Sequence, residues 1–153
     1  MSLRIAVEDP DQPEIRRMLA EGEAHSASLY PAESNHHLPL DALRRPGVLF
    51  HVARHADGRA VGTGALVLHG DWAEVKRMWT DGTARGRGVA RAILAALEAA
   101  ARTHGVAVLR LETGVDSHAA LALYRSAGFV ETGPFADYAP DPLSVFMERR
   151  LGP

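Results

Sequence analysis

Apolar and polar residues recur along this chain with two different periods, and each change of period marks a change of element. A period of two predicts a strand, whereas apolar positions three and four residues apart predict a helix. Strands are expected at residues 3–8, 48–55, 60–68, 72–80, 106–113, 129–132 and 143–150. Helices are expected from Asp9–Asp11 to a point before Pro31, at 38–45, at 89–104 and from Ser117 to Gly128.

The third of these helices has the clearest apolar stripe. Its members are spaced by three and four residues and are Val89, Ile93, Leu97, Ala100 and His104. Charged residues fall on the opposite face, so the stripe is expected to pack against a sheet.

Turn residues separate the predicted elements. Asp57-Gly58 and His69-Gly70-Asp71 join three consecutive strands into a meander. Gly105 and Gly128 follow two of the helices, as C′ glycines do, and Ser117 is expected to cap the last helix. The order is therefore βααβββαβαββ. It predicts one α/β (α+β) domain over residues 1–153, with helices flanking a mixed sheet.

Composition narrows the function. The chain has 153 residues, 46% apolar and 24% charged, and it has no cysteine, which excludes disulfides, thiolate metal sites and a cysteine nucleophile. A net charge of −2 provides no positive field for nucleic acid or an anionic membrane. No apolar run approaches the roughly 18 residues of a membrane span, and the N-terminal stretch is too acidic for a signal peptide. We expect a cytoplasmic bacterial protein.

The junction after residue 80 carries the strongest chemical signal. It reads Arg85-Gly86-Arg87-Gly88-Val89-Ala90, which is a glycine-rich turn that enters a helix. Free N–H groups and the helix dipole at such an N-terminus favour phosphate. The turn has neither the Gly-Lys-Ser/Thr of a nucleotide P-loop nor the third glycine of a dinucleotide fingerprint. A diphosphate bound without metal remains, and an ordinary helix entry with turn glycines is the alternative.

Two blocks resemble the GNAT acetyltransferase superfamily. Arg85-x-x-Gly88-x-Ala90 is similar to its acetyl-coenzyme A signature, and Ser117-x-x-Ala120-x-x-Leu123-Tyr124-x-x-x-Gly128-Phe129 is similar to its downstream block. The resemblance implies a mostly antiparallel sheet and an N-acetyltransferase that uses acetyl-coenzyme A (acetyl-CoA) and no metal.

The resemblance also implies where acetyl-CoA lies. Backbone groups of the strand end are expected to hold the pantetheine, and these are Met78, Trp79 and Thr80. Amides and cations of the turn are expected to hold the pyrophosphate, and these are Arg85, Gly86, Arg87, Gly88, Val89 and Ala90. Tyr124 is expected near the sulfur. Ser117 stands where the family has asparagine, so it either contacts the pantetheine or only caps its helix.

Glu74 is the candidate general base. An alkylamine with a pKa of about 10.4 is neutral in only about one molecule in 2,500 at pH 7, so a base should assist it. A strand glutamate at this offset is also what the resemblance implies, and a period of two places residues 74, 76, 78 and 80 on one face. The alternatives are a Glu74 ion pair with Lys76 or Arg77, a water, or His36, His37 or His69 as base.

Tyr124 is the candidate general acid for the departing thiolate, and a core tyrosine is the alternative. A backbone N–H near Met78 is expected to meet the developing oxyanion. Because the chain has no cysteine, the acceptor amine is expected to attack the bound thioester directly.

The acceptor is expected between two loops, Tyr30–Leu38 and Phe135–Ser144. Residues that would contact a small amine or amino-acid-like acceptor are Glu33, His36, Arg77, Lys76, Asp137, Tyr138 and Asp141. The alternatives to a small acceptor are a protein or peptide amine, or a non-catalytic acyl-CoA sensor. A homodimer through the C-terminal strands is compatible with the sequence.

Overall fold

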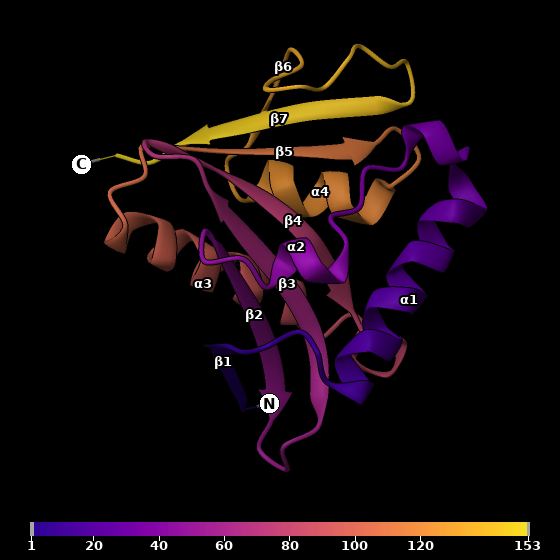
Figure 1. Cartoon of the computed structure of the whole chain (residues 1–153), viewed down its shortest axis with the longest axis vertical. Helices are drawn as coiled ribbons and strands as arrows, with labels where there is room; N and C mark the ends of the chain where they lie inside the picture. Colours follow the sequence, from indigo (N-terminus) through magenta and orange to yellow (C-terminus); the bar gives the residue numbers. More distant parts are fainter. Residues whose placement is uncertain (1, 153) are drawn as a thin grey trace.

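A computed structural model describes residues 2–152 as one twisted sheet with helices on both faces (Figure 1). Within these residues seven strands pair in the order β1-β2-β3-β4-β5-β7-β6. They are β1 (Leu3–Val7), β2 (Val48–His55), β3 (Ala60–Leu68), β4 (Trp72–Thr80), β5 (Val108–Gly114), β6 (Val130–Thr132) and β7 (Ser144–Arg150). All neighbouring pairs are antiparallel except β4 and β5. The mixed, mostly antiparallel sheet is therefore confirmed.

Four α-helices and two short 3₁₀ turns complete the fold. The helices are α1 (Pro13–Leu29), α2 (Leu40–Leu43), α3 (Val89–Thr103) and α4 (His118–Ser126), and the 3₁₀ turns are η1 (Ala32–Ser34) and η2 (Gly82–Ala84). The second helix is shorter than predicted, one turn at most. None of the helices in residues 2–152 is long and apolar enough to cross a membrane.

Two apolar clusters lie on opposite faces of the sheet. One joins α3 and α4 to the sheet through buried residues such as Ile93, Leu97 and Leu121. The other joins α1 and α2 to β2 and β3 through Ile15 and Leu43 among others. The predicted α3 stripe is buried at residues 89, 93 and 97, but His104 is exposed at the helix C-cap, which corrects its assignment to that stripe.

A bulge in β4 breaks the predicted alternation of its side chains. Ala65 pairs with Lys76, but Thr63 pairs with Trp79, so β4 has one extra residue opposite β3. Arg77 adopts φ of 57°, a left-handed backbone that is uncommon outside glycine. As a result Glu74, Lys76 and Trp79 share the α1 face. Residues 78 and 80 turn to the α3 face, so the prediction that 74, 76, 78 and 80 share one face is wrong.

The two parallel strands separate after a short paired stretch. Residues Trp72–Glu74 pair with Val108–Arg110, and within the described chain β4 and β5 do not pair with each other beyond these residues. Figure 1 shows the β4 and β5 arrows spreading apart toward their tips. The two strands therefore diverge like the sides of a wedge beyond Glu74 and Arg110.

Candidate functional site

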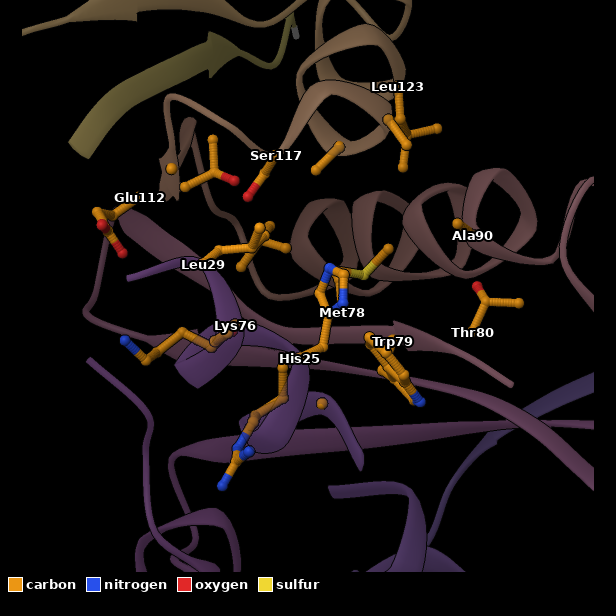
Figure 2. Close-up of a pocket in the computed structure, with 18 of the residues that line it drawn as sticks. His25, Leu29, Lys76, Met78, Trp79, Thr80, Ala90, Glu112, Ser117 and Leu123 are labelled. Atoms are coloured by element: carbon orange, nitrogen blue, oxygen red, sulfur yellow. The ribbon is translucent and has the colours of Figure 1, made fainter. Parts of the chain in front are cut away.

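A cavity of about 700 Å³ occupies the wedge between β4 and β5. Its walls come from α1, the segment 34–38, β4, the turn before α3, the end of β5 and α4. In Figure 2, Ala90 and Thr80 lie at one end of the cavity, and Glu112 and Lys76 lie at the other. Its volume is in the range of small-molecule sites, which suits a ligand that spans from one face of the sheet to the other.

The end nearest α3 is built from backbone. Gly86 and Gly88 both have φ of 78°, which glycine adopts without steric cost, and open space surrounds the position of a Cβ at each. Gly88 is the N-cap of α3, and no side chain caps the first amides of the helix. The N–H groups of Val89 and Ala90 therefore remain free for an anion, as the sequence predicted for this turn.

The two arginines of the turn differ. The Arg85 guanidinium lies over the Trp79 ring at 4.7 Å and donates from Nε to the Thr80 carbonyl at 3.4 Å, and the residue lines the cavity. Arg87 is exposed and does not contribute to the lining. Of the two predicted cations, the structure therefore brings only Arg85 to the cavity.

Tyr124 lines the cavity from α4. It is 6% exposed, its ring packs edge-to-face on Phe129, and its hydroxyl has no hydrogen-bond partner among residues 2–152. Burial raises the pKa of Tyr124 above its ordinary value, so the phenol keeps its proton at neutral pH. An unshared hydroxyl at this place can donate to a ligand atom in the gap.

Ser117 lies on the cavity wall but does not cap α4 with its side chain. It occupies the N-cap position, yet its hydroxyl is 2.8 Å from the Tyr30 hydroxyl, and no side-chain cap bond is formed. The Tyr30 oxygen also accepts from the Asp116 amide at 3.0 Å. The predicted capping bond is therefore wrong, because Tyr30, at the end of α1, takes the Ser117 hydroxyl instead.

Glu74 belongs to a buried three-residue cluster rather than to a solvated face. It is 7% exposed, and its Oε2 accepts a hydrogen bond from the Tyr138 hydroxyl and lies 3.4 Å from the Lys76 ammonium. Lys76 also donates to the Tyr138 oxygen at 2.8 Å. Burial, followed by the Glu74 carboxylate, raises the pKa of Tyr138, so its proton stays on the phenol. Tyr138 does not line the cavity itself, but it holds two residues that do.

Glu112 is a second carboxylate at this end of the cavity, and the sequence analysis did not single it out. It is half-buried on β5 and accepts a hydrogen bond from the Ser144 hydroxyl at 2.8 Å. Burial raises the pKa of Glu112, and the nearby Glu74 adds to that direction, while Ser144, His36 and Lys76 oppose it. Its only sequence signal was an acidic residue in a mainly apolar strand that Arg110 also interrupts.

Only some of the residues predicted to contact the acceptor line the cavity. His36 lines the cavity and packs edge-to-face on Tyr138 at 5.2 Å. Arg77 also lines it, but its guanidinium donates to the carbonyls of Leu38 and Leu19 and to Glu23, so it braces α1. Glu33 is exposed outside the lining.

Three other predicted loop residues lie outside the cavity wall. Asp137 is exposed, and Asp141 accepts a hydrogen bond from Ser34. His69, an alternative base, stacks on Trp72 at 4.2 Å at the opposite end of β4 from Thr80.

The remaining alternative base, His37, lines the cavity beside His36. Within residues 2–152, no group of three or more His, Asp or Glu side chains is arranged to hold a metal ion.

These features fit an elongated thioester with a diphosphate at one end. Free amides and positive-φ glycines suit the diphosphate, and the unpaired edge of β4 beyond Glu74 suits an extended amide-bearing arm. Tyr124, whose hydroxyl is unshared, lines the same cavity.

Comparison with known proteins agrees with this geometry. The sequence profile described as the acetyltransferase (GNAT) family matches residues 13–129. An IAA acetyltransferase from Azospirillum brasilense is 45% identical over 152 residues, which cover 98% of this chain and 99% of the relative.

Solved structures agree as well. A crystal structure from Klebsiella pneumoniae subsp. pneumoniae, provisionally described as an acyl-CoA N-acyltransferase, is 38% identical with a TM-score of 0.83, covering 98% of each chain. The PaiA N-acetyltransferase of Thermoplasma acidophilum, in complex with coenzyme A, has a TM-score of 0.75 at 18% identity and covers 99% of this chain and 100% of that one. The second likeness concerns the fold alone.

Proposed function

Because this chain belongs to the acetyltransferase (GNAT) family and is an N-acetyltransferase, we propose that it moves the acetyl group of acetyl-CoA to a primary amine of a small molecule. One observation carries this proposal: one cavity joins the free amides at the start of α3 to the carboxylates of Glu74 and Glu112, and Tyr124 lines the same cavity.

Residues at the α3 end would hold the cofactor. The amides from Gly86 to Ala90 would bind the pyrophosphate, with Arg85 beside it, and Met78–Thr80 would pair with the pantetheine along the open edge of β4. Arg87 is exposed outside the cavity lining, so it would contact the pyrophosphate only from the solvent side. The bound thioester supplies an activated acetyl group, and a backbone N–H near Met78 would meet the charge that develops on its oxygen.

Tyr124 would donate the proton that the departing sulfur takes. In water a phenol of pKa about 10 is a weak donor toward a thiolate whose thiol has a pKa of about 8.5. Burial raises the pKa of Tyr124, and the same dry surroundings raise the basicity of a thiolate placed beside it, so the transfer is supported at this site. Without cysteine in the chain, the amine attacks the thioester directly.

The acceptor would lie on the α1 face between α1 and the segment 34–38. Carboxylates there attract an ammonium group, and the Lys76 ammonium and the His36 ring suit a carboxylate on the same acceptor. Both features support an amino-acid-like acceptor. The Azospirillum relative is named an IAA acetyltransferase, which is a reason to test IAA beside the amines.

The test is thiol release from acetyl-CoA by the purified chain against alkylamines, amino acids and IAA, with mass spectrometry of the product. We expect thiol release that depends on a primary amine and an acceptor heavier by one acetyl group. Binding of acetyl-CoA without turnover of any acceptor, or thiol release that no acceptor stimulates, would contradict the proposal.

A further inference from the structure

We propose that Glu112, rather than Glu74, takes the proton from the acceptor ammonium. The inference rests on the proposed acetyl transfer. Its structural basis is the point at which β4 and β5 stop pairing with each other. The last paired residues are Glu74 on β4 and Arg110 on β5, and in a parallel pair the next same-face residues are Lys76 and Glu112. These two therefore flank the opening of the gap on the α1 face, where an acceptor must approach.

The two carboxylates are not equally available. Glu74 Oε2 already accepts from the Tyr138 hydroxyl and lies 3.4 Å from the Lys76 ammonium, so two groups engage this oxygen. Glu112 has one donor, the Ser144 hydroxyl on its Oε2, and no ammonium within salt-bridge distance among the described residues. On both carboxylates Oε1 has no hydrogen-bond partner in that part of the chain, so the two differ in the groups around Oε2. Figure 2 shows the Glu112 side chain reaching into the cavity at the end that Lys76 also borders.

The surroundings of Glu112 suit a base that works near neutral pH. Burial raises the pKa of the carboxyl, which strengthens it as a proton acceptor. The charged or titratable groups that face it are Glu74 and Lys76 from β4 and His36 from the segment before α2, with Ser144 from β7 as its hydrogen-bond donor. Glu74 acts through Tyr138 and Lys76 as a positioning residue, because it holds the ammonium of Lys76 beside the gap.

The step balances as follows in protons and electron pairs. One proton of the R–NH₃⁺ acceptor passes to the Glu112 carboxylate, and the freed nitrogen lone pair forms the N–C bond. The C–S bond breaks with its electron pair on sulfur, and that sulfur takes the Tyr124 proton. The nitrogen gives up a second proton, which restores Tyr124, and Glu112 releases its proton to water. The net products are the amide, the free thiol and one proton.

The experiment compares Glu112→Gln and Glu74→Gln with the unchanged protein, using an alkylamine acceptor from about pH 6 to about pH 9. We expect Glu112→Gln to lose at least about a hundredfold in kcat/KM at neutral pH, the low end of general-base effects. Its deficit should shrink as pH rises, by up to about tenfold per unit, because more acceptor is already neutral. Acetyl-CoA affinity, measured by calorimetry, should not change.

Two further variants separate catalysis from folding and charge. Glu148→Gln removes the same charge from β7, where Glu148 faces Arg110 at 3.7 Å, and should keep the rate and pH profile. Ser144→Ala removes a hydrogen bond that lowers the pKa of Glu112. The pKa should therefore rise, and the low-pH limb of the profile should move to higher pH.

Several results would overturn the assignment. A Glu112→Gln variant within about twofold of the unchanged protein, or a loss that is the same at every pH, removes Glu112 as the base. If Glu74→Gln instead gives the pH-dependent loss, Glu74 is the base. Failure of the unchanged protein to acetylate any amine is a different outcome, since it contradicts the proposed function itself.

Discussion

The two ends of the cavity are built in opposite ways. At the end beside α3, which we propose binds the diphosphate (the phosphate end), the groups proposed to bind are backbone amides of one continuous run, residues 86–90, shaped by two positive-φ glycines. At the acceptor end they are side chains brought together from distant segments. Lys76 meets Tyr138 across 62 positions of sequence, and Tyr30 meets Ser117 across 87.

The difference has a physical consequence. A backbone site follows from local dihedral angles, so its geometry depends on a few glycines and the first turn of α3. A side-chain site exists only after the sheet, α1 and the loop before β7 have assembled, because each member is held by a partner from another element. Substitutions should therefore act locally at one end and in coupled pairs at the other.

After Glu112→Gln, the largest effect on activity is expected from Tyr124, which lines the same cavity. Tyr124→Phe removes only a hydroxyl that has no partner in the described chain, so the packing against Phe129 should persist. We expect kcat to fall at least about tenfold, since an acid for the thiolate is lost, with acetyl-CoA affinity unchanged. Steady-state kinetics and calorimetry on the same preparation measure the two quantities.

Unchanged turnover in Tyr124→Phe would remove this residue as the acid and leave a water in that role. A weaker acetyl-CoA affinity with normal kcat would instead assign the hydroxyl to binding. The pH profile gives a further check, because burial raises the pKa of Tyr124. Its phenol should then stay protonated to high pH. Any fall in rate on the alkaline side of the pH profile close to neutral pH should therefore persist in Tyr124→Phe.

A smaller effect is expected at Gly88, and it tests whether the phosphate end is local. Gly88→Ala places a Cβ on a residue with φ of 78°, which costs an L-residue roughly 1–2 kcal/mol or forces the turn to shift. We expect acetyl-CoA affinity to weaken about tenfold as the amides of Val89 and Ala90 move, which corresponds to about 1.4 kcal/mol.

Gly70 provides the matched control for that strain. It has φ of 84°, open space around the position of its Cβ, and a place in the β3–β4 turn outside the cavity. Gly70→Ala should lower stability by a similar amount and leave acetyl-CoA affinity as it was. Equal affinity losses in both variants would show that strain, rather than the phosphate site, explains the result at Gly88.

Features that depend on local sequence could be predicted, whereas features that depend on distant partners could not. The bounds of β2, β3 and β4 match the prediction, because Asp57-Gly58 and the Gly70 turn punctuate a clear period of two. The turn before α3 was also found, since glycines before an apolar helix are a local signal. The resemblance to the family also rested on two short continuous blocks of sequence, residues 85–90 and 117–129.

What the sequence could not predict depends on distant partners. The bulge at Arg77 could not be predicted, because no glycine marks the positive φ in the sequence. The Arg77 side chain contacts Leu38 and Glu23, which are distant in sequence. In the sequence Glu112 is one of the polar residues that interrupt an apolar strand, as Arg110 is. Its place in a cavity wall depends on the divergence of β4 and β5, which the sequence does not show. The capping assignment of Ser117 failed because Tyr30 competes for its hydroxyl.

The smallest effect on activity, but the clearest coupling, is expected between Tyr30 and Gly114. A Cβ on Gly114 would overlap the Tyr30 hydroxyl oxygen, so the ring and a side chain at 114 cannot share the space. Gly114→Ala should expel the ring, break its bonds with Ser117 and Asp116, and lower the free energy of unfolding by about 1–3 kcal/mol. Activity should fall only a few-fold, since neither residue takes part in proton transfer.

Removing the ring first should abolish that cost. In a Tyr30→Ala background the space is free, so adding Gly114→Ala should change the unfolding free energy by less than about 0.5 kcal/mol. Gly133→Ala, where open space surrounds the position of a Cβ, is the matched control and should be neutral in both backgrounds. Equal losses from Gly114→Ala with and without Tyr30, in denaturant titrations, would mean that the two act independently. A coupled result would establish that this wall of the acceptor end forms as a unit, because the glycine at the tip of β5 is needed only to seat an aromatic ring from the end of α1.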